Sequence, residues 1–211
     1  MSSPHPRGVF VTLEGIDGAG KSTQFATLVG ALRETGRDVV ATREPGGTPL
    51  GERIRELLLH ETMAPSTEAL LMFAARQEHV LRVIEPALLR GSDVVCDRFT
   101  DASLAYQGAG KGIPLDRLQA LAHWVHPGLR PDLSVLLDLP PEVAAQRLRG
   151  RDADRFEREP LAFFERVRAQ YLQLAAAEPQ RWLVVDAQAA PERVAATLRA
   201  ALQRLLEAHH S

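Results

Sequence analysis

An eight-residue stretch near the start of the chain constrains the fold more than any other feature. It reads Gly15-Ile16-Asp17-Gly18-Ala19-Gly20-Lys21-Ser22. An apolar run at residues 9–13 precedes it, and a helical pattern at residues 21–34 follows it. Glycines let a backbone curl so that successive amides point inward, and the start of a helix adds partial positive charge. A strand, a glycine-rich loop and a helix in this order predict a cradle for phosphate groups.

The fit to G-x-x-x-x-G-K-[ST] makes this cradle a nucleoside triphosphate site. The side chain of Lys21 can reach the β- and γ-phosphates, and the hydroxyl of Ser22 is placed to bind Mg²⁺. We expect the loop and the first helical turn to hold the nucleotide through nine residues: Gly15, Ile16, Asp17, Gly18, Ala19, Gly20, Lys21, Ser22 and Thr23.

Short apolar runs alternate with helical patterns along the rest of the chain. We expect strands at residues 9–13, 38–42, 93–96, 133–139 and 182–185. Helices are expected at residues 21–34, 49–60, 66–89, 114–125, 160–177 and 191–207, with one more after Pro140-Pro141. Continuously apolar strands separated by helices are typical of a parallel sheet covered on both faces. The predicted fold class is therefore α/β, a P-loop three-layer fold with a five-stranded parallel sheet, in a single domain over residues 1–211.

Composition excludes several classes of protein. The 211 residues carry 25 Lys and Arg against 27 Asp and Glu, so no basic field indicates nucleic acid or an anionic membrane as a partner. The one cysteine, Cys96, excludes an internal disulfide. No apolar run approaches the roughly 20 residues that cross a bilayer, and residues 1–7 do not resemble a signal peptide. We expect a cytoplasmic protein.

Three kinds of P-loop protein compete at this point: a GTPase switch, a mechanical or helicase ATPase, and a small-molecule kinase. The chain has no Asn-Lys-x-Asp sequence of the kind that reads guanine, and it has no basic face suited to nucleic acid. A nucleotide kinase, by contrast, needs a second anion site that faces the γ-phosphate and a closing arginine lid. The charge-dense segment at about residues 147–160 is a candidate mobile lid. The arginines that could supply charge from it are Arg147, Arg149, Arg151 and Arg155.

Two arginines follow neighbouring strands of the predicted sheet. Arg43 comes after the second strand and Arg98 after the third. Because ligands bind at the carboxyl ends of parallel strands, these two guanidiniums can hold one phosphate between them. Asp97 ends the third strand, where a carboxylate can hold Mg²⁺ directly or through water. We therefore predict a metal site formed by Ser22 and Asp97.

Four motifs, in their order along the chain, resemble those of thymidylate kinases. They are the phosphate loop with its Asp17, T-R-E-P-G-G at 42–47, F-A-A-R at 73–76, and D-R-F at 97–99 continuing to S-L-A-Y-Q-G at 103–108. The similarity spans about residues 8–186. It implies phosphorylation of dTMP to dTDP by ATP with Mg²⁺, a bacterial type of enzyme with lid arginines, and a homodimer.

The resemblance also implies roles at the acceptor site. Phe73 and Arg76 share a helix face, and they would stack on the thymine ring and donate to one of its carbonyl oxygens. Ser103 would help to discriminate the base. Tyr106 and Gln107 would lie near the sugar and base, with Tyr106 excluding a ribose hydroxyl. The expected substrate-binding set is Asp17, Arg43, Phe73, Arg76, Arg98, Ser103, Tyr106 and Gln107.

Catalytic charge is expected from the lid. Some members of the family carry an arginine in the phosphate loop where this chain has Gly18, so the charge must come from elsewhere. Asp154 and Glu157 resemble family positions near the substrate. An arginine that arrives on closure stabilises the transferring phosphoryl group and excludes water. The expected catalytic set is Lys21, Arg98, Arg151 and Arg155.

Two alternatives stay open at this stage. The chain could be another nucleoside monophosphate or deoxynucleoside kinase, or a non-catalytic ATP-binding regulatory module.

The expected topology predicts that the adenine of ATP lies near the loop after the fifth strand, at residues 187–190.

Overall fold

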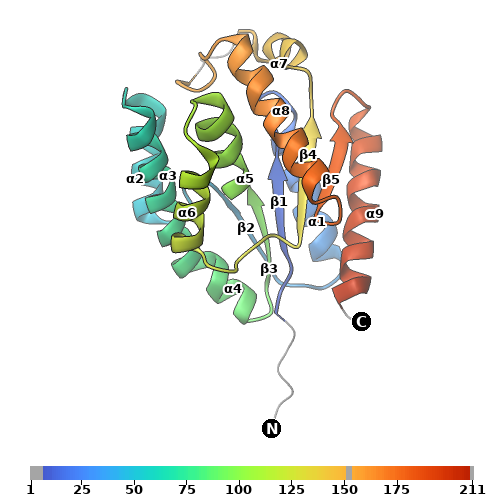
Figure 1. The fold of residues 1–211 in the computed structure, drawn as a ribbon. Coiled ribbons are helices and arrows are strands. Elements are labelled where there is room, and N and C mark those ends of the chain that lie inside the picture. The colour runs from blue at the N-terminus through green and yellow to red at the C-terminus, as the bar shows by residue number, and fades with distance from the viewer. Residues whose placement is uncertain (1–6, 151–153, 210–211) are drawn as a thin grey trace.

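A five-stranded sheet lies at the centre of the computed structural model, which describes residues 7–150 and 154–209 (Figure 1). The strands are β1 (Phe10–Glu14), β2 (Val39–Arg43), β3 (Asp93–Asp97), β4 (Leu133–Asp138) and β5 (Trp182–Asp186). Their order across the sheet is β2-β3-β1-β4-β5, and every pairing is parallel. The predicted P-loop α/β fold is thus confirmed.

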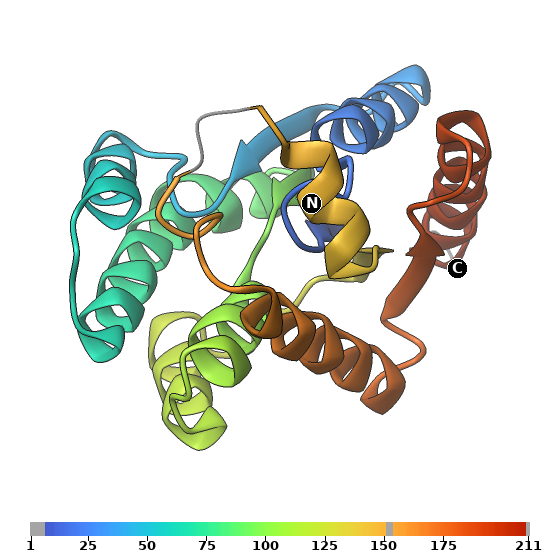
Figure 2. The same cartoon turned by 90° about the horizontal axis from the view of Figure 1, so that it is seen from above.

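Helices cover both faces of the sheet. They are α1 (Lys21–Glu34), α2 (Pro49–His60), α3 (Pro65–His79), η1 (Val80–Ile84), α4 (Glu85–Leu89), α5 (Thr100–Ser103), η2 (Leu104–Gly110), α6 (Leu115–Val125), α7 (Pro141–Leu148), α8 (Leu161–Ala177) and α9 (Pro191–His209). Helices α1 and α9 pack together on one face, whereas α8 and η2 pack together on the other (Figures 1 and 2). The layers therefore enclose β1, whose five residues are all buried.

Local chemistry explains where the helices begin. The side chain of Thr48 caps α2 by accepting a hydrogen bond from the amide of Gly51 at 2.9 Å, and Pro49 occupies the first helical position. Helix α1 begins differently, because Gly20 precedes it and no side chain caps it. The first amides of α1 thus keep their donors for something other than a capping side chain.

Two helical segments differ from the sequence prediction. The helix expected at 66–89 contains the π-helical stretch η1 between α3 and α4. A second π-helical stretch, η2, follows directly after α5. Residues 100–110 are therefore helical, although no helix was predicted there. The glycines of η2 are required by packing, since a Cβ at Gly110 would lie 2.4 Å from the Phe163 ring of α8. Such contacts obscure the ordinary apolar period of a helix.

The parallel arrangement brings the ends of the strands to one edge. The phosphate loop follows β1, Arg43 ends β2, and Asp97 ends β3. Within residues 7–150 and 154–209, no helix has both the length and the apolar sequence needed to cross a bilayer.

Candidate functional site

The phosphate loop passes so close to its neighbours that two of its positions require glycine. Gly15 has φ +135°, and a Cβ there would lie 2.7 Å from the carbonyl oxygen of Leu137 in β4. Gly18 has φ +83°, and a Cβ there would lie 2.9 Å from the carbonyl oxygen of Ala144 in α7. The loop is therefore wedged between the sheet and α7, with its last residue, Gly20, leading into the uncapped start of α1. This geometry suits an anion held by backbone amides.

The ammonium group of Lys21 is enclosed by this loop. Only 8% of the residue is exposed, and Nζ donates to the carbonyl oxygens of Gly15 at 3.2 Å and Ile16 at 3.1 Å. It also lies 3.3 Å from Oδ1 of Asp17. Burial and the nearby Arg98 charge lower the pKa of Lys21. The loop thus encloses a buried positive charge. Ser22 and Thr23 are exposed at the first turn of α1.

Arg98 connects the end of β3 to the phosphate loop. Its Nη1 donates to the carbonyl oxygen of Gly15 and its Nη2 to Oδ1 of Asp17, both at 2.8 Å. Burial acts to raise the pKa of Asp17, but the charges of Arg98 and Lys21 outweigh it and hold that pKa well below its usual range. Asp17 is therefore a carboxylate, and the loop carries compensating charges of both signs.

The backbone of Arg98 is itself unusual. Its φ of +68° is in the left-handed region, which residues other than glycine rarely adopt. Two hydrogen bonds hold it there: its amide donates to the carbonyl oxygen of Leu13 at 3.0 Å, and the next amide, that of Phe99, donates to Oε1 of Glu14 at 2.9 Å. The end of β1 thus sets the direction in which the Arg98 side chain leaves β3.

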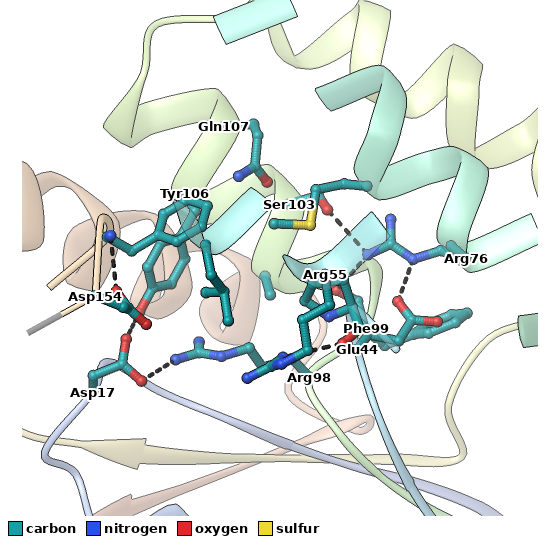
Figure 3. A pocket seen from close by; sticks show the side chains of 15 residues that line it. Asp17, Glu44, Arg55, Arg76, Arg98, Phe99, Ser103, Tyr106, Gln107 and Asp154 are labelled. Carbon is teal, nitrogen blue, oxygen red and sulfur yellow. Dashed lines mark hydrogen bonds and ion pairs between the residues drawn. The ribbon is translucent and has the colours of Figure 1, made fainter. Parts of the chain in front are cut away.

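A pocket opens beside Arg98, and Figure 3 shows the side chains that line it. Residues of the phosphate loop, α2, α3, α5, η2 and the lid segment contribute to it. Its lining consists of Asp17, Glu44, Pro45, Arg55, Leu59, Met72, Arg76, Arg98, Phe99, Ala102, Ser103, Tyr106, Gln107, Asp154 and Phe156. Polar groups thus converge among apolar walls, as in pockets that bind small molecules.

Arg76 is a buried charge at the wall of the pocket, held by Glu44 and Ser103 (Figure 3). It is 2% exposed, and its Nε donates to Oε2 of the buried Glu44 at 2.7 Å. Nη2 donates to Oγ of Ser103 at 3.0 Å and to the carbonyl oxygen of Phe99 at 3.2 Å. Nη1 has no hydrogen-bond partner among the described residues. A buried donor without a partner costs free energy, so this atom is a candidate contact for a ligand.

Tyr106 and Gln107 form the wall contributed by η2. The Tyr106 ring lies 4.8 Å from the guanidinium of Arg98, and its hydroxyl donates to Oδ2 of Asp17 at 3.4 Å. Burial raises the pKa of Tyr106, so the side chain is a neutral phenol. Gln107 is 1% exposed, and its Nε2 donates to Oε1 of Glu68 at 2.9 Å.

The structure brings six of the predicted substrate-binding residues to this pocket and leaves two outside it. Those in the lining are Asp17, Arg76, Arg98, Ser103, Tyr106 and Gln107. Arg43 does not line the pocket, because its side chain is 55% exposed and donates to Glu52 at 2.9 Å. Phe73 does not line it either, because it is 2% exposed and packs in an apolar cluster with Leu104 and Leu118.

Two residues that the sequence analysis missed take their places in the lining. Arg55 of α2 lies near Arg98, and burial and the charges of Arg43 and Arg98 lower its pKa. Met72 of α3 precedes Arg76 by four residues, and so shares its helix face more closely than Phe73 does. The sequence signal that could have found both residues is helical spacing, because residues four apart lie on the same face of a helix. Arg55 and Leu59 have this spacing, as do Met72 and Arg76, and all four line the pocket.

The two predicted metal ligands flank the phosphate loop. Ser22 is exposed at the start of α1, and Asp97 ends β3, close enough for its charge to act on Lys21. Oδ1 of Asp97 is buried and has no partner among the described residues. No group of three or more acidic, His or Cys side chains in the described part of the chain could hold a metal alone. An oxygen set this sparse fits Mg²⁺, which keeps several waters and binds substrate phosphates.

The lid arginines point in different directions. Arg147 of α7 donates to the carbonyl oxygen of Gly18 at 3.3 Å and to that of Ala187 at 3.0 Å. Arg155 faces away from the loop, because Nε donates to the carbonyl oxygen of Leu58 at 2.9 Å and Nη2 lies 2.6 Å from Glu68. The predicted Arg151 lies outside the described residues.

Comparisons with known proteins agree on one family. The sequence profile of the thymidylate kinase family matches residues 13–198. Thymidylate kinases from Bordetella petrii and Cupriavidus metallidurans are 58% and 60% identical to this chain. These alignments cover 95% and 86% of this chain, and 98% and 90% of the relatives. The crystal structure of thymidylate kinase from Ehrlichia chaffeensis superposes with a TM-score of 0.75 at 32% identity, covering 95% of this chain and 99% of that one.

Proposed function

Because the chain belongs to the thymidylate kinase family, we propose that it transfers the γ-phosphoryl group of ATP to dTMP, forming dTDP and ADP. One observation carries the proposal. Arg98 bonds to the carbonyl oxygen of Gly15 in the phosphate loop while its side chain lines the adjacent pocket. A donor phosphate in the loop and an acceptor phosphate in the pocket would therefore meet at this guanidinium.

On the donor side, the loop amides and Lys21 bind the phosphates of ATP. The uncapped start of α1 adds partial positive charge. Arg147 lies between the phosphate loop and Ala187, the region that topology assigns to the adenine. Of the lid arginines in the described residues, it is the one that contacts the loop, so we include it with Arg151 as a candidate source of catalytic charge.

On the acceptor side, two arginines from different elements hold the phosphate of dTMP. Arg98 approaches from β3, and Arg55 approaches from α2. Together they offset the repulsion between acceptor and donor phosphates, which brings the two reacting groups into line. Asp17 already neutralises part of the Arg98 charge, and it is placed to accept from the 3′-hydroxyl of the sugar or from a water that this hydroxyl holds.

The far end of the pocket recognises the base. The unpartnered Nη1 of Arg76 donates to a carbonyl oxygen of thymine, with Ser103 beside it. Met72 and Phe99 supply apolar walls for the ring. Tyr106 stands at the sugar, where its bulk disfavours a ribose hydroxyl.

The chemistry requires no protein base. The attacking group is a phosphate oxygen of dTMP, which is anionic near neutral pH, so catalysis consists of positioning and charge stabilisation. Ser22 and Asp97 would hold Mg²⁺, which neutralises charge on the donor phosphates when bound. The orphaned, buried Oδ1 of Asp97 supports this assignment.

Assembly and location complete the proposal. Family membership and large exposed apolar side chains on neighbouring helices support a homodimer: Leu70 of α3 is 57% exposed and Trp124 of α6 is 76% exposed. Sedimentation of the wild type and of Trp124→Asp tests it, because the charge should favour the monomer. We place the reaction in the cytoplasm, in keeping with a chain whose one cysteine is free.

A coupled assay of ADP formation across dTMP, dUMP, dCMP, dGMP and AMP tests the function directly. We expect dTMP to give the highest kcat/KM. A better acceptor among the other four would indicate a different nucleoside monophosphate kinase. Stoichiometric ATP binding without turnover on any acceptor would indicate a regulatory module instead.

A further inference from the structure

The carboxylate of Glu68 is buried where three elements meet. It stands in the first turn of α3 and is 1% exposed. Oε1 accepts a hydrogen bond from Nε2 of Gln107 in η2 at 2.9 Å, and Oε2 lies 2.6 Å from Nη2 of Arg155 in the lid segment. A carboxylate removed from water needs a partner for each oxygen. The contact with Gln107 therefore holds η2 against α3, and the contact with Arg155 holds the lid segment against α3.

The contact with Gln107 fixes the orientation of its amide. Because a carboxylate only accepts hydrogen bonds, it selects the NH₂ end of Gln107 and leaves Oε1 to accept from a ligand. Gln107 lines the acceptor pocket (Figure 3). Thymine carries a hydrogen on N3, whereas N3 of cytosine is an acceptor. An amide held in this orientation therefore favours thymine over cytosine.

The contact with Arg155 seats the lid segment. The same guanidinium donates to the carbonyl oxygen of Leu58 at the end of α2 and lies 4.5 Å from the ring of Phe156. The residues on either side of Arg155, Asp154 and Phe156, both line the pocket. Arg155 thus holds residues 154–156 at the wall of the pocket and turns its charge toward α3, away from the phosphate loop.

We propose that Glu68 is a positioning residue that couples the seating of residues 154–156 to the orientation of the Gln107 amide. This inference rests on the proposed function, since it takes the pocket to be the dTMP site. When the lid segment is seated, Arg155 pairs with Oε2 of Glu68 and holds the carboxylate in place. The carboxylate then fixes the amide of Gln107 in the orientation that binds the acceptor. Acceptor binding and lid closure therefore favour each other through one carboxylate.

Hydrogen exchange of peptides covering residues 154–160 reports lid seating without any turnover. We expect faster exchange in Glu68→Gln and in Arg155→Ala than in the wild type, because each loses the charge-paired contact. Exposed residues on α8 and α2 give matched controls, Glu165→Gln and Arg53→Ala, which should exchange as the wild type does. Unchanged exchange in both test variants would overturn the proposal.

Kinetics separate the two contacts. We expect both variants to raise the KM for dTMP by about tenfold, because each loses the buried ion pair between Glu68 and Arg155, with kcat and the KM for ATP within about twofold of wild type. Glu68→Gln should lower the preference for dTMP over dCMP most. Arg155→Ala should lower it in the same direction but less, since it keeps the bond between Glu68 and Gln107 and only frees the Glu68 carboxylate to move. Arg155→Lys should restore part of the KM.

Two kinetic results would contradict the coupling. A lower kcat at unchanged KM in Arg155→Ala would place that arginine on the transferring phosphoryl group. An unchanged dCMP preference in Glu68→Gln would remove the Gln107 contact from the proposal. If Glu68→Gln does not fold, Glu68→Asp takes its place, because it keeps the charge and shortens the reach. Absence of dTMP turnover in the wild type would refute the proposed function alone, since the exchange measurement needs no substrate.

Discussion

Nη2 of Arg98 lies 2.8 Å from Oδ1 of Asp17, which joins the end of β3 to the phosphate loop. Asp17 also accepts a hydrogen bond from the Tyr106 hydroxyl, and its Oδ1 lies 3.3 Å from Nζ of Lys21. Two cations and one anion thus sit between the donor loop and the acceptor pocket. The surplus positive charge matches a site where two phosphate groups must approach each other.

Removal of the loop cation tests the donor half of this arrangement. We expect Lys21→Ala to lower kcat by about a hundredfold or more, because the donor phosphates lose a preorganised charge. The other lysine, Lys111, pairs with Glu159 outside the pocket, so Lys111→Ala should keep kcat close to wild type. Steady-state kinetics and circular dichroism of both variants check this. An active, folded Lys21→Ala would refute the assigned donor site.

Arg55 and Arg43 should differ in how much each contributes to binding of the acceptor phosphate. Arg55 lines the pocket, whereas Arg43 is 55% exposed and pairs with Glu52. We expect Arg55→Ala to raise the KM for dTMP by about ten- to a hundredfold through loss of a charge-assisted contact, and Arg43→Ala to change it less than about threefold. The KM for ATP serves as the internal control. A larger effect at Arg43 would restore the arginine pair expected from the sequence.

The base end of the pocket gives a similar contrast between neighbours on α3. Met72 lines the pocket, and Phe73 is buried in the cluster with Leu104 and Leu118. Phe73→Ala should therefore destabilise the fold by about 3–5 kcal/mol, whereas Met72→Ala should cost about 1–2 kcal/mol. Met72→Ala should instead raise the KM for dTMP about tenfold through lost apolar contact. Urea unfolding and dTMP titrations measure both. Equal stability losses would remove the distinction.

The sequence predicted the fold well because the relevant signals are local. Apolar runs located both ends of all five strands to within one residue, and the glycine loop indicated the connection from β1 to α1. The helical segment at 100–110 escaped prediction because η2 is π-helical and because α5 and η2 together present Ser103, Tyr106 and Gln107 to the pocket. Residues chosen for a ligand do not follow the apolar period of a helix.

The site was harder to predict where side-chain direction matters. Motif order identified Arg98 and Arg76 as pocket residues, but position at the end of a strand did not show that Arg43 would turn to Glu52. The sequence analysis named Phe73, whereas its neighbour Met72 lines the pocket, a difference of one residue in helical phase. The lid position of Arg155 depends on Glu68, a partner 87 positions earlier, which no local pattern reveals.

The buried Glu14 makes stability depend on pH. It is fully buried, and burial and the nearby Asp101 carboxylate raise its pKa to about 8 against the opposing charge of Arg98. The folded state therefore binds a proton that the unfolded state, with a pKa near 4.5, has lost. The free energy of unfolding should fall as pH rises through this window, by up to about 1.4 kcal/mol per pH unit.

Urea unfolding between pH 6.5 and 8 isolates this effect, because His126, whose pKa burial lowers to about 4, gives the opposite slope only below that range. Glu14→Gln should remove the slope, since its amide can still accept from Phe99 and donate to the Tyr171 oxygen. Glu34→Gln, at an exposed position paired with Arg199, should leave the slope unchanged. If the wild type and Glu14→Gln lose stability in parallel over these pH values, the proton is not on Glu14, and the bond that holds Phe99 and the turn of Arg98 is made by a carboxylate.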